Sequence, residues 1–327
     1  MTSIGQQLHG LLLVDKPKGI TSHDVVQKVR CLFGTKAVGH TGTLDPLATG
    51  LMVLLMGEGT KISQYILSGD KGYEVTAQLG LVTDTLDVDG KVVRHQEVAL
   101  ESELIKKTVE SFYGRRELEV PLYSAVKKKG KKLYELARES KPVETPVRSM
   151  HFYNVEMLEA GGDRFRARVS CYKGGYIRSW VKAIGDQLEC GASVEELRRT
   201  MSGQYHVDQA VDLEKLGQMV QEAKKAGPEA FGSVYIPLRQ ALPQWKAVMV
   251  SGRDEQLMVN GQVSYNLNRR LIVEKKVANQ SQKTVPIKIL SSQTGQLLSI
   301  LEALPEGGLK IRRIFLGSSG LPRNKSS

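Results

Sequence analysis

The sequence predicts an α+β fold with a largely antiparallel, mixed sheet, followed by a small C-terminal unit that is mainly β. Over the first two hundred residues, short apolar runs alternate with helix-spaced ones, but they form no regular βαβ repeat. After Gly227-Pro228, an irregular stretch extends to Pro243, and strand-like runs with Gly- and Asn-rich turns follow it. We therefore expect one domain over residues 1–243 and a second over residues 244–327.

In the N-terminal part, apolar runs and turn residues predict three strands and one helix. The runs are typical of buried or half-buried strands at 10–14, 51–56 and 73–79. The segment Thr21-Ser22-His23-Asp24 offers helix caps ahead of apolar residues at helical spacing, so a helix is expected to begin there. Asp89-Gly90 is a turn signal, which predicts that the strand over 73–79 folds back on residues 91–93.

The rest of the chain predicts five more helices, a hairpin and four short strands. Apolar residues at helical spacing predict helices at 101–113, 133–138, 179–188, 194–199 and 214–226. Around Gly161-Gly162-Asp163, we expect a hairpin that pairs 150–158 with 164–171. The strands expected in the C-terminal unit are 247–250, 271–274, 285–290 and 297–301.

The composition is that of an ordinary soluble globular protein, with 41% hydrophobic and 25% charged residues. The longest apolar run, 51–56, is far shorter than the ~18 residues that span a bilayer, and the N-terminus lacks a secretory pattern. The three cysteines are odd in number and form no C-x-x-C pair, which favours reduced thiols in a cytosol. We therefore expect a cytoplasmic protein with no membrane partner.

The charge balance points to a polyanionic partner. Lys and Arg number 46 against 35 Asp and Glu, so the net charge is +11. Such an excess favours nucleic acid, although it can also serve solubility alone. One run is strongly basic, and it is either a solvated surface or a set of phosphate contacts; it comprises Lys127, Lys128, Lys129, Lys131 and Lys132.

The sequence offers no pattern for a metal or nucleotide cofactor. The six histidines form no H-x-x-H pair and do not combine with cysteine at zinc spacing. The acidic segment 83–90 lacks the carboxylates that a calcium loop needs at its first and last positions. Two segments combine glycine with lysine, 16–19 and 57–61, and neither matches the pattern of a phosphate-binding loop. We therefore expect no metal, nucleotide or redox cofactor.

The segment 39–50 is the richest in special residues, because its glycines, threonines and Pro46 make a tightly turned loop before the strand at Leu51. Asp45 in this loop is well placed to be a positioned nucleophile, although Asp-Pro can also simply begin a turn. If Arg178 faced Asp45, its guanidinium would hold the carboxylate ionised and oriented. Arg178 could equally be a surface residue of the helix that follows it.

Two tyrosines also have two interpretations. Tyr73 begins a predicted strand and Tyr176 precedes a predicted helix, so either ring could belong to the core. Aromatic faces beside a cationic groove are also the surfaces on which unstacked bases sit. The residues alone leave both alternatives open.

Seven segments, in order along the chain, resemble the motifs of the TruB family, the transfer RNA pseudouridine synthases that act on uridine 55 of the T loop. They are Asp15–Ser22, Gly39–Gly50 (GHTGTLDPLATG), Thr83–Asp87, Tyr123–Lys127, Leu133–Arg138, Gly175–Arg178 and Leu197–Arg199. The C-terminal part resembles the family only in size, β character and its basic segment at 310–313. The resemblance implies a pseudouridine synthase catalytic domain followed by a PUA-like RNA-binding domain.

The resemblance also implies roles for individual residues. Asp45 is expected to be the catalytic aspartate that becomes covalently linked, Arg178 its ion-pair partner, and Tyr73 the residue that stacks on the target base. The expected lining of the pocket is Leu197, Lys16, Pro17 and Tyr176. The residues expected to contact RNA are His40, Arg198, Arg199 and the lysines of the basic run, and segment 123–148 is expected to clamp the RNA.

The chain departs from the family pattern at positions around these motifs, namely Leu118, Val120, Gly175, Trp180, Ala183 and Ser193. None is the expected nucleophile or its arginine. The resemblance implies a cofactor-free enzyme that acts on the tRNA T-arm as a monomer, without a guide RNA or protein partner. The alternatives are a non-catalytic tRNA-binding or refolding protein, an N-glycoside hydrolase, which usually works with paired carboxylates, and an enzyme that modifies ribosomal RNA within a guided complex.

Overall fold

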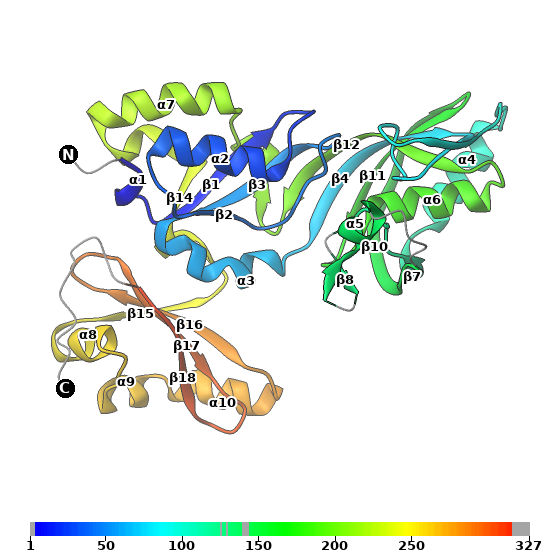
Figure 1. Ribbon diagram of the computed structural model, residues 1–327. Helices are drawn as coiled ribbons and strands as arrows, with labels where there is room; N and C mark the ends of the chain where they lie inside the picture. The colour runs from blue at the N-terminus through cyan, green and yellow to red at the C-terminus, as the bar shows by residue number, and fades with distance from the viewer. Residues whose placement is uncertain (1–3, 125, 129, 139–143, 316–327) are drawn as a thin grey trace.

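The computed structural model describes residues 4–124, 126–128, 130–138 and 144–315 (Figure 1). A ten-stranded mixed sheet forms the larger part of the molecule, with the central order β14-β1-β3-β12-β4-β11-β10-β7. The strands are β1 (Gly10–Lys16), β2 (Val38–His40), β3 (Thr49–Met56), β4 (Lys71–Leu79), β7 (Gly114–Glu119), β10 (Val147–Gly161), β11 (Arg164–Cys171), β12 (Ala192–Ser202), β13 (Tyr205–His206) and β14 (Tyr235–Pro237). Within this sheet, the named strands pair in antiparallel fashion except for the short β12–β3 contact, so the predicted fold class is confirmed.

Helices pack on this sheet, and most of them contribute side chains to one hydrophobic core. On the β1–β3 half lie α1 (Ile4–Gln7), α2 (Ser22–Phe33) and α7 (Leu213–Ala226), and on the β4–β10 half lie α4 (Ser102–Ser111) and α6 (Ile177–Gln187). Helix α2 begins at the predicted caps, because the Thr21 side chain accepts from the Asp24 backbone N–H and Asp24 accepts from that of Thr21. The core runs without a break from Val25 of α2 to Trp180 of α6.

Short elements complete this part of the chain. After β3 come a 3₁₀ turn (Gly57–Ile62) and α3 (Ser63–Leu67), and after β7 come the ribbon β8 (Lys127–Lys128) and β9 (Lys131–Lys132) and then α5 (Leu133–Arg138). Three further 3₁₀ turns are Val207–Gln209, Pro228–Val234 and Leu238–Gln240. All three cysteines are free thiols, with Cys171 and Cys190 buried. Among the described residues, no helix is long and apolar enough to cross a membrane.

The C-terminal segment forms a separate four-stranded sheet in the order β15-β16-β17-β18. Its strands are β15 (Lys246–Val250), β16 (Val285–Ser291), β17 (Leu297–Ala303) and β18 (Leu309–Ile314). Three helices connect β15 to β16, namely α8 (Gly252–Val259), α9 (Tyr265–Arg270) and α10 (Ile272–Ser281), and they give this unit more helix than its sequence pattern predicts. Leu297, Ile300 and Phe315 pack against Leu11 and Val53, which joins this unit to the face of the β1–β3 half opposite α2.

Three sequence predictions of local structure are wrong. Residues 194–199 are not a helix but part of β12, where a bulge between Val194 and Glu196 places Val194 and Leu197 on the same buried side and so imitates helical spacing. Residues 272–274 begin α10 and Leu271 is its N-cap, so this segment is not a strand; Leu271 and Glu274 are buried while the two residues between them are exposed, as on one face of a helix.

The third concerns the turn at Asp89-Gly90. The strand after it, β6 (Val92–His95), pairs with β5 (Leu81–Thr83) and not with β4. Both edges of β4 are already occupied by β11 and β12, so no edge remains for a third strand.

Candidate active site

The loop 41–48, between β2 and β3, is fixed at the centre of the sheet. The Leu44 backbone N–H donates to Ser22 Oγ over 2.7 Å, and the Thr41 N–H donates to the Val53 carbonyl over 3.1 Å. After the loop, β3 meets β12 at Gly50 with a φ of 98°, and a Cβ there would overlap the Arg199 carbonyl oxygen, so only glycine fits. The loop that carries Asp45 is therefore held rigidly.

Asp45 of this loop and Arg178 of α6 form an ion pair, as the family resemblance implies. Arg178 Nη2 lies 2.9 Å from Asp45 Oδ2, and the arginine side chain is only 7% exposed whereas that of Asp45 is 36% exposed. The guanidinium also donates to the Thr85 carbonyl over 2.8 Å and to the Tyr123 carbonyl over 2.9 Å. Because these carbonyls fix the guanidinium, Arg178 orients the carboxylate while leaving part of it open to solvent.

A second carboxylate lies near the same guanidinium. Asp87 Oδ2 is 3.9 Å from Arg178 Nη1, and the Asp87 side chain accepts a 2.6 Å hydrogen bond from the Thr85 hydroxyl. Burial raises the pKa of Asp87 above its ordinary value. The sequence predicts no individual role for Asp87. The alternation of threonines and aspartates in 83–89 is the signal that could have indicated a hydrogen-bonded acid there.

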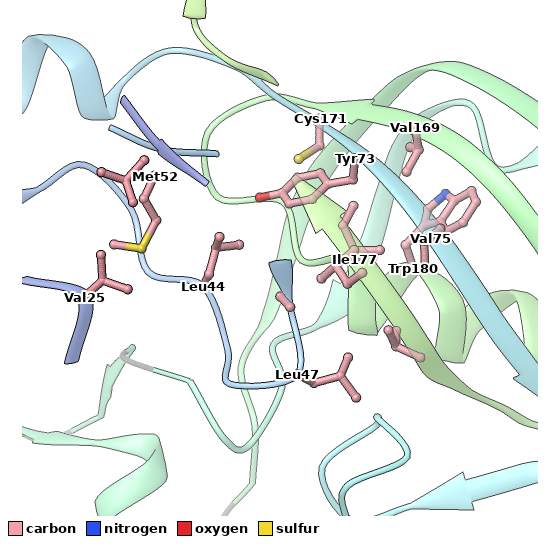
Figure 2. Close-up of a cluster of buried hydrophobic side chains, with 14 of the residues drawn as sticks. Val25, Leu44, Leu47, Met52, Tyr73, Val75, Val169, Cys171, Ile177 and Trp180 are labelled. Atoms are coloured by element: carbon pink, nitrogen blue, oxygen red, sulfur yellow. The ribbon is translucent and has the colours of Figure 1, made fainter. Parts of the chain in front are cut away.

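Tyr73 lies on β4 beside this loop, in the cluster shown in Figure 2 with Leu44, Leu47 and Ile177. Only 9% of the residue is exposed. Burial raises the pKa of its hydroxyl to about 12, although the neighbouring Arg199 opposes the shift. The phenol is therefore neutral at physiological pH, and it lies close enough to Asp45 for the charge of that carboxylate to raise its pKa further.

Lys16 is fully buried at the end of β1. Its ammonium donates to the carbonyls of Pro17 and Ile20 over 2.9 and 2.7 Å, and to that of Pro46 over 3.3 Å. Burial lowers the pKa of Lys16 to about 8, and the charge of Asp45 works against that shift. Lys16 therefore anchors Pro46, the residue after Asp45, through its backbone carbonyl. Pro17 lies on the surface, and its carbonyl accepts a hydrogen bond from Lys16.

The other residues predicted to line the pocket lie on two different elements. Leu197, on β12 opposite Val75, is buried and lines a pocket of about 180 Å³ with Leu47 and Thr49. Tyr176 is half-buried at the start of α6, two residues before Arg178, and burial raises the pKa of its hydroxyl. Both therefore flank the segments that carry the ion pair.

The structure contradicts the prediction that Arg199 contacts RNA. Only 2% of the residue is exposed, and its guanidinium donates to the carbonyls of Leu51, Thr43 and Gly42 over 2.7, 3.4 and 3.3 Å. A buried arginine whose donors bind backbone carbonyls cannot reach a phosphate, so Arg199 instead holds the Asp45 loop against β12. The neighbouring Arg198 is partly exposed and forms a two-bond ion pair with Asp15, at 2.6 and 3.1 Å.

The remaining residues predicted to bind RNA lie at the edges of the site. His40 ends β2 and is half-buried, which lowers the pKa of its imidazole. Lys127 and Lys131 are exposed on the β8–β9 ribbon, to which Lys128 and Lys132 also belong. Lys129 and part of the predicted clamp, residues 139–143, lie outside the described residues.

Four departures from the family pattern have structural explanations. Trp180 is buried and donates to the Phe112 carbonyl over 3.2 Å, and Val120 is also buried. Ser193 donates to the Leu81 carbonyl over 3.0 Å. At Gly175, a Cβ would lie 2.7 Å from the Cβ of Cys171, so this backbone excludes a side chain. Nothing in the structure explains Leu118 or Ala183.

Comparison with known proteins places the chain in a family. Residues 30–177 match the model described as the N-terminal domain of TruB family pseudouridylate synthase, and residues 178–243 match the tRNA pseudouridylate synthase B C-terminal domain. A protein of Bdellovibrio bacteriovorus, tRNA pseudouridine synthase B, is 44% identical over 310 residues, which is 94% of this chain and 97% of that protein. This chain belongs to the TruB family.

Further comparisons agree with a TruB assignment. The tRNA pseudouridine synthase B of Stutzerimonas stutzeri is 41% identical over 79% of this chain and 84% of its own length. Among solved structures, a chain of an H/ACA RNP bound to a substrate RNA containing 2'-deoxyuridine matches 98% of this chain and 87% of its own, with a TM-score of 0.67 and 20% identity. A chain of a Cbf5-Nop10-Gar1 complex gives a TM-score of 0.65 at 22% identity, over 94% of this chain and 84% of that one. These two structures share the fold of this chain over nearly its whole length.

Proposed function

We propose that this protein is a tRNA pseudouridine synthase that converts uridine 55 in the T loop of tRNA to pseudouridine. The observation that carries the proposal is the half-open Asp45 carboxylate, held 2.9 Å from the buried guanidinium of Arg178 and beside the buried ring of Tyr73. The names of the TruB relatives support the same reaction on tRNA.

The reaction is an isomerisation, so its atoms and electrons balance without a second substrate. The N1–C1′ bond breaks, the base turns, and a C5–C1′ bond forms while C5 loses a proton and N1 gains one. Asp45 forms a temporary covalent bond to the nucleotide and is released at the end, which divides one difficult step into easier ones. Because nothing is oxidised or transferred to another molecule, this chemistry requires no cofactor.

The geometry supports a division of labour within the site. Arg178 binds one oxygen of Asp45, which leaves the other oxygen free to form the covalent bond. Flipping the target base out of its loop costs a few kcal/mol, and stacking on the Tyr73 ring recovers about 1–3 kcal/mol. Leu197 and Tyr176 supply walls for the flipped base, and Lys16 stabilises the backbone beneath it.

The wider surface supports binding of the tRNA T-arm. The net charge of +11 favours phosphate contacts, with Lys127 and Lys131 exposed on the β8–β9 ribbon within the proposed clamp, 123–148. His40, which directly precedes the Asp45 loop, would enter the T loop of the tRNA. We further propose that residues 244–327 act as a PUA-like RNA-binding domain, and that the enzyme works in the cytoplasm as a monomer without a guide RNA.

Replacement of Asp45 by Asn tests the proposal, because it removes the nucleophile and keeps the shape of the side chain. We expect Asp45→Asn to make no pseudouridine in tRNA while its tRNA affinity stays within about threefold of wild type, and the exposed Asp208→Asn serves as a matched control with full activity. Near-wild-type turnover by Asp45→Asn would remove Asp45 from its role. A wild-type protein that binds tRNA without changing it would be a binder, and release of free uracil would identify a glycoside hydrolase.

A further inference from the structure

Three aromatic side chains form a cluster where strands β10 and β11 lie side by side. The His151 and Tyr172 rings are stacked, with centroids 4.6 Å apart and an interplanar angle of 8°, and the Tyr153 ring packs 5.3 Å from that of Tyr172. Tyr172 is 50% exposed, so its ring remains accessible although His151 covers part of it. We call Tyr172, His151 and Tyr153 the aromatic platform.

The aromatic platform is held in place by hydrogen bonds. The Tyr172 backbone N–H donates to the His151 carbonyl over 3.1 Å, which fixes the two rings against each other. The Tyr153 hydroxyl donates to Asp70 Oδ2 over 2.7 Å, and this bond together with burial raises the pKa of Tyr153. The platform therefore loses little conformational freedom when a flat ligand stacks on it.

The platform lies at the end of the sheet next to the candidate active site. Cys171, the residue before Tyr172, packs with Tyr73 in the buried cluster of Figure 2. Asp70, which holds Tyr153, precedes Lys71, and the Cε of Lys71 lies 3.9 Å from the position of a Cβ on Gly42 in the Asp45 loop. Tyr172 directly follows β11, and its side chain is half exposed whereas that of Cys171 is buried. Through Cys171 and Lys71, the platform is therefore connected to the end of the sheet that carries Tyr73 and the Asp45 loop.

The charges around the platform fit a nucleic acid. Lys173 follows Tyr172 directly and is exposed, and the exposed Arg115 of β7 lies directly opposite His151 in the strand register. Asp70 is occupied by the Tyr153 hydroxyl. An aromatic ring flanked by two exposed cations matches a base together with its phosphates, since every base has a π-face and its backbone is anionic.

We propose that the aromatic platform binds a second unpaired base of the substrate RNA, which stacks on Tyr172 while Lys173 and Arg115 contact its phosphates. The inference rests on the proposed function, because it assigns the platform to the same tRNA substrate. The platform is then a positioning surface, which holds the RNA so that the target uridine reaches Asp45 and takes no part in the bond changes.

Kinetics and binding of the Tyr172→Ala variant with full-length tRNA test the inference. We expect KM and Kd to rise about tenfold while kcat stays within a factor of two, because stacking contributes to binding and not to the chemical step. Tyr172→Phe keeps the ring and should restore both values. Tyr113, two residues after the end of α4, is 61% exposed and outside the platform, so Tyr113→Ala is the matched control and should behave as wild type.

A substrate series identifies the base. T-arm RNAs that each lack one base at a different loop position are compared for binding to wild type and to Tyr172→Ala. We expect one position at which base removal weakens wild-type binding about tenfold but does not weaken binding of Tyr172→Ala further. An unchanged Kd in Tyr172→Ala, or an equal loss in Tyr113→Ala, would overturn the inference while wild type still makes pseudouridine. A wild type without pseudouridine activity would instead defeat the proposed function.

Discussion

Replacing Arg178 by Met removes the guanidinium that holds the site together and keeps a side chain of similar length. Three charge-assisted hydrogen bonds are lost, to Asp45, Thr85 and Tyr123. Breaking a buried ion pair costs about 3–5 kcal/mol. Because Asp45 is partly solvated after the change, we expect the lower end, a loss of about 3 kcal/mol in the free energy of unfolding. We also expect pseudouridine formation to fall by a factor of about 100 or more, since a misplaced reacting group costs about that much.

Urea unfolding measures the first quantity, and single-turnover pseudouridine formation with enzyme in excess over tRNA measures the second. Lys182→Met is the control on the same helix, because Lys182 forms an exposed 2.7 Å pair with Asp186 worth only about 0.3–0.5 kcal/mol. Arg178→Lys keeps the charge but cannot bind two carbonyls and a carboxylate as a planar fork does, so we expect it to remain mostly inactive. An Arg178→Met protein that keeps its stability within about 0.5 kcal/mol, or its full rate, would refute the reasoning.

Two further predictions concern stability. Because burial lowers the pKa of Lys16 to about 8 in the folded protein, the unfolded chain binds more protons above that pH, and Lys16 contributes a rise in stability from about pH 8 to pH 10. Urea unfolding across this range should show a smaller rise in Lys16→Met than in wild type or the exposed control Lys173→Met, and equal slopes would contradict the cause assigned to the shift. Gly50→Ala, which meets the Arg199 carbonyl, should destabilise the fold by about 2 kcal/mol more than Gly307→Ala, which has a φ of 88° and open space around it. Thermal unfolding compares the two, and an equal loss would mean that the β3–β12 approach is not tight.

Strand and helix patterns predicted most elements of the large sheet because they depend on local spacing. The capping residues before α2 and the hairpin of β10 and β11 are examples, since each is specified within a short segment. The prediction for residues 194–199 failed because a bulge interrupts the alternation of the strand, so that its apolar pattern imitates the spacing of a helix. The sequence prediction also missed the three helices between β15 and β16, for a different reason. Their amphipathic pattern is weak, and few of their residues are buried.

The candidate site could be predicted only in part from local patterns. The loop around Asp45 stands out by its composition, but its arginine is 133 positions away, and only resemblance to a family joined the two. The position of Arg199 was not predictable, because the same residue type serves equally in a phosphate contact and in a buried bond to backbone carbonyls. Which of the two applies depends on the face of the sheet on which the Arg199 side chain lies, and the tertiary fold alone determines that face.

The large sheet brings together segments that lie far apart in the sequence, which has a consequence during synthesis on the ribosome. Strands β1 and β3 emerge early, but Arg178 and Arg199, which hold the Asp45 loop, emerge more than a hundred residues later, and the β14 partner of β1 later still. A nascent chain that ends before Arg199 therefore lacks contacts that hold the loop. Competence to capture RNA thus arises late in translation, after nearly all of the large sheet has left the exit tunnel.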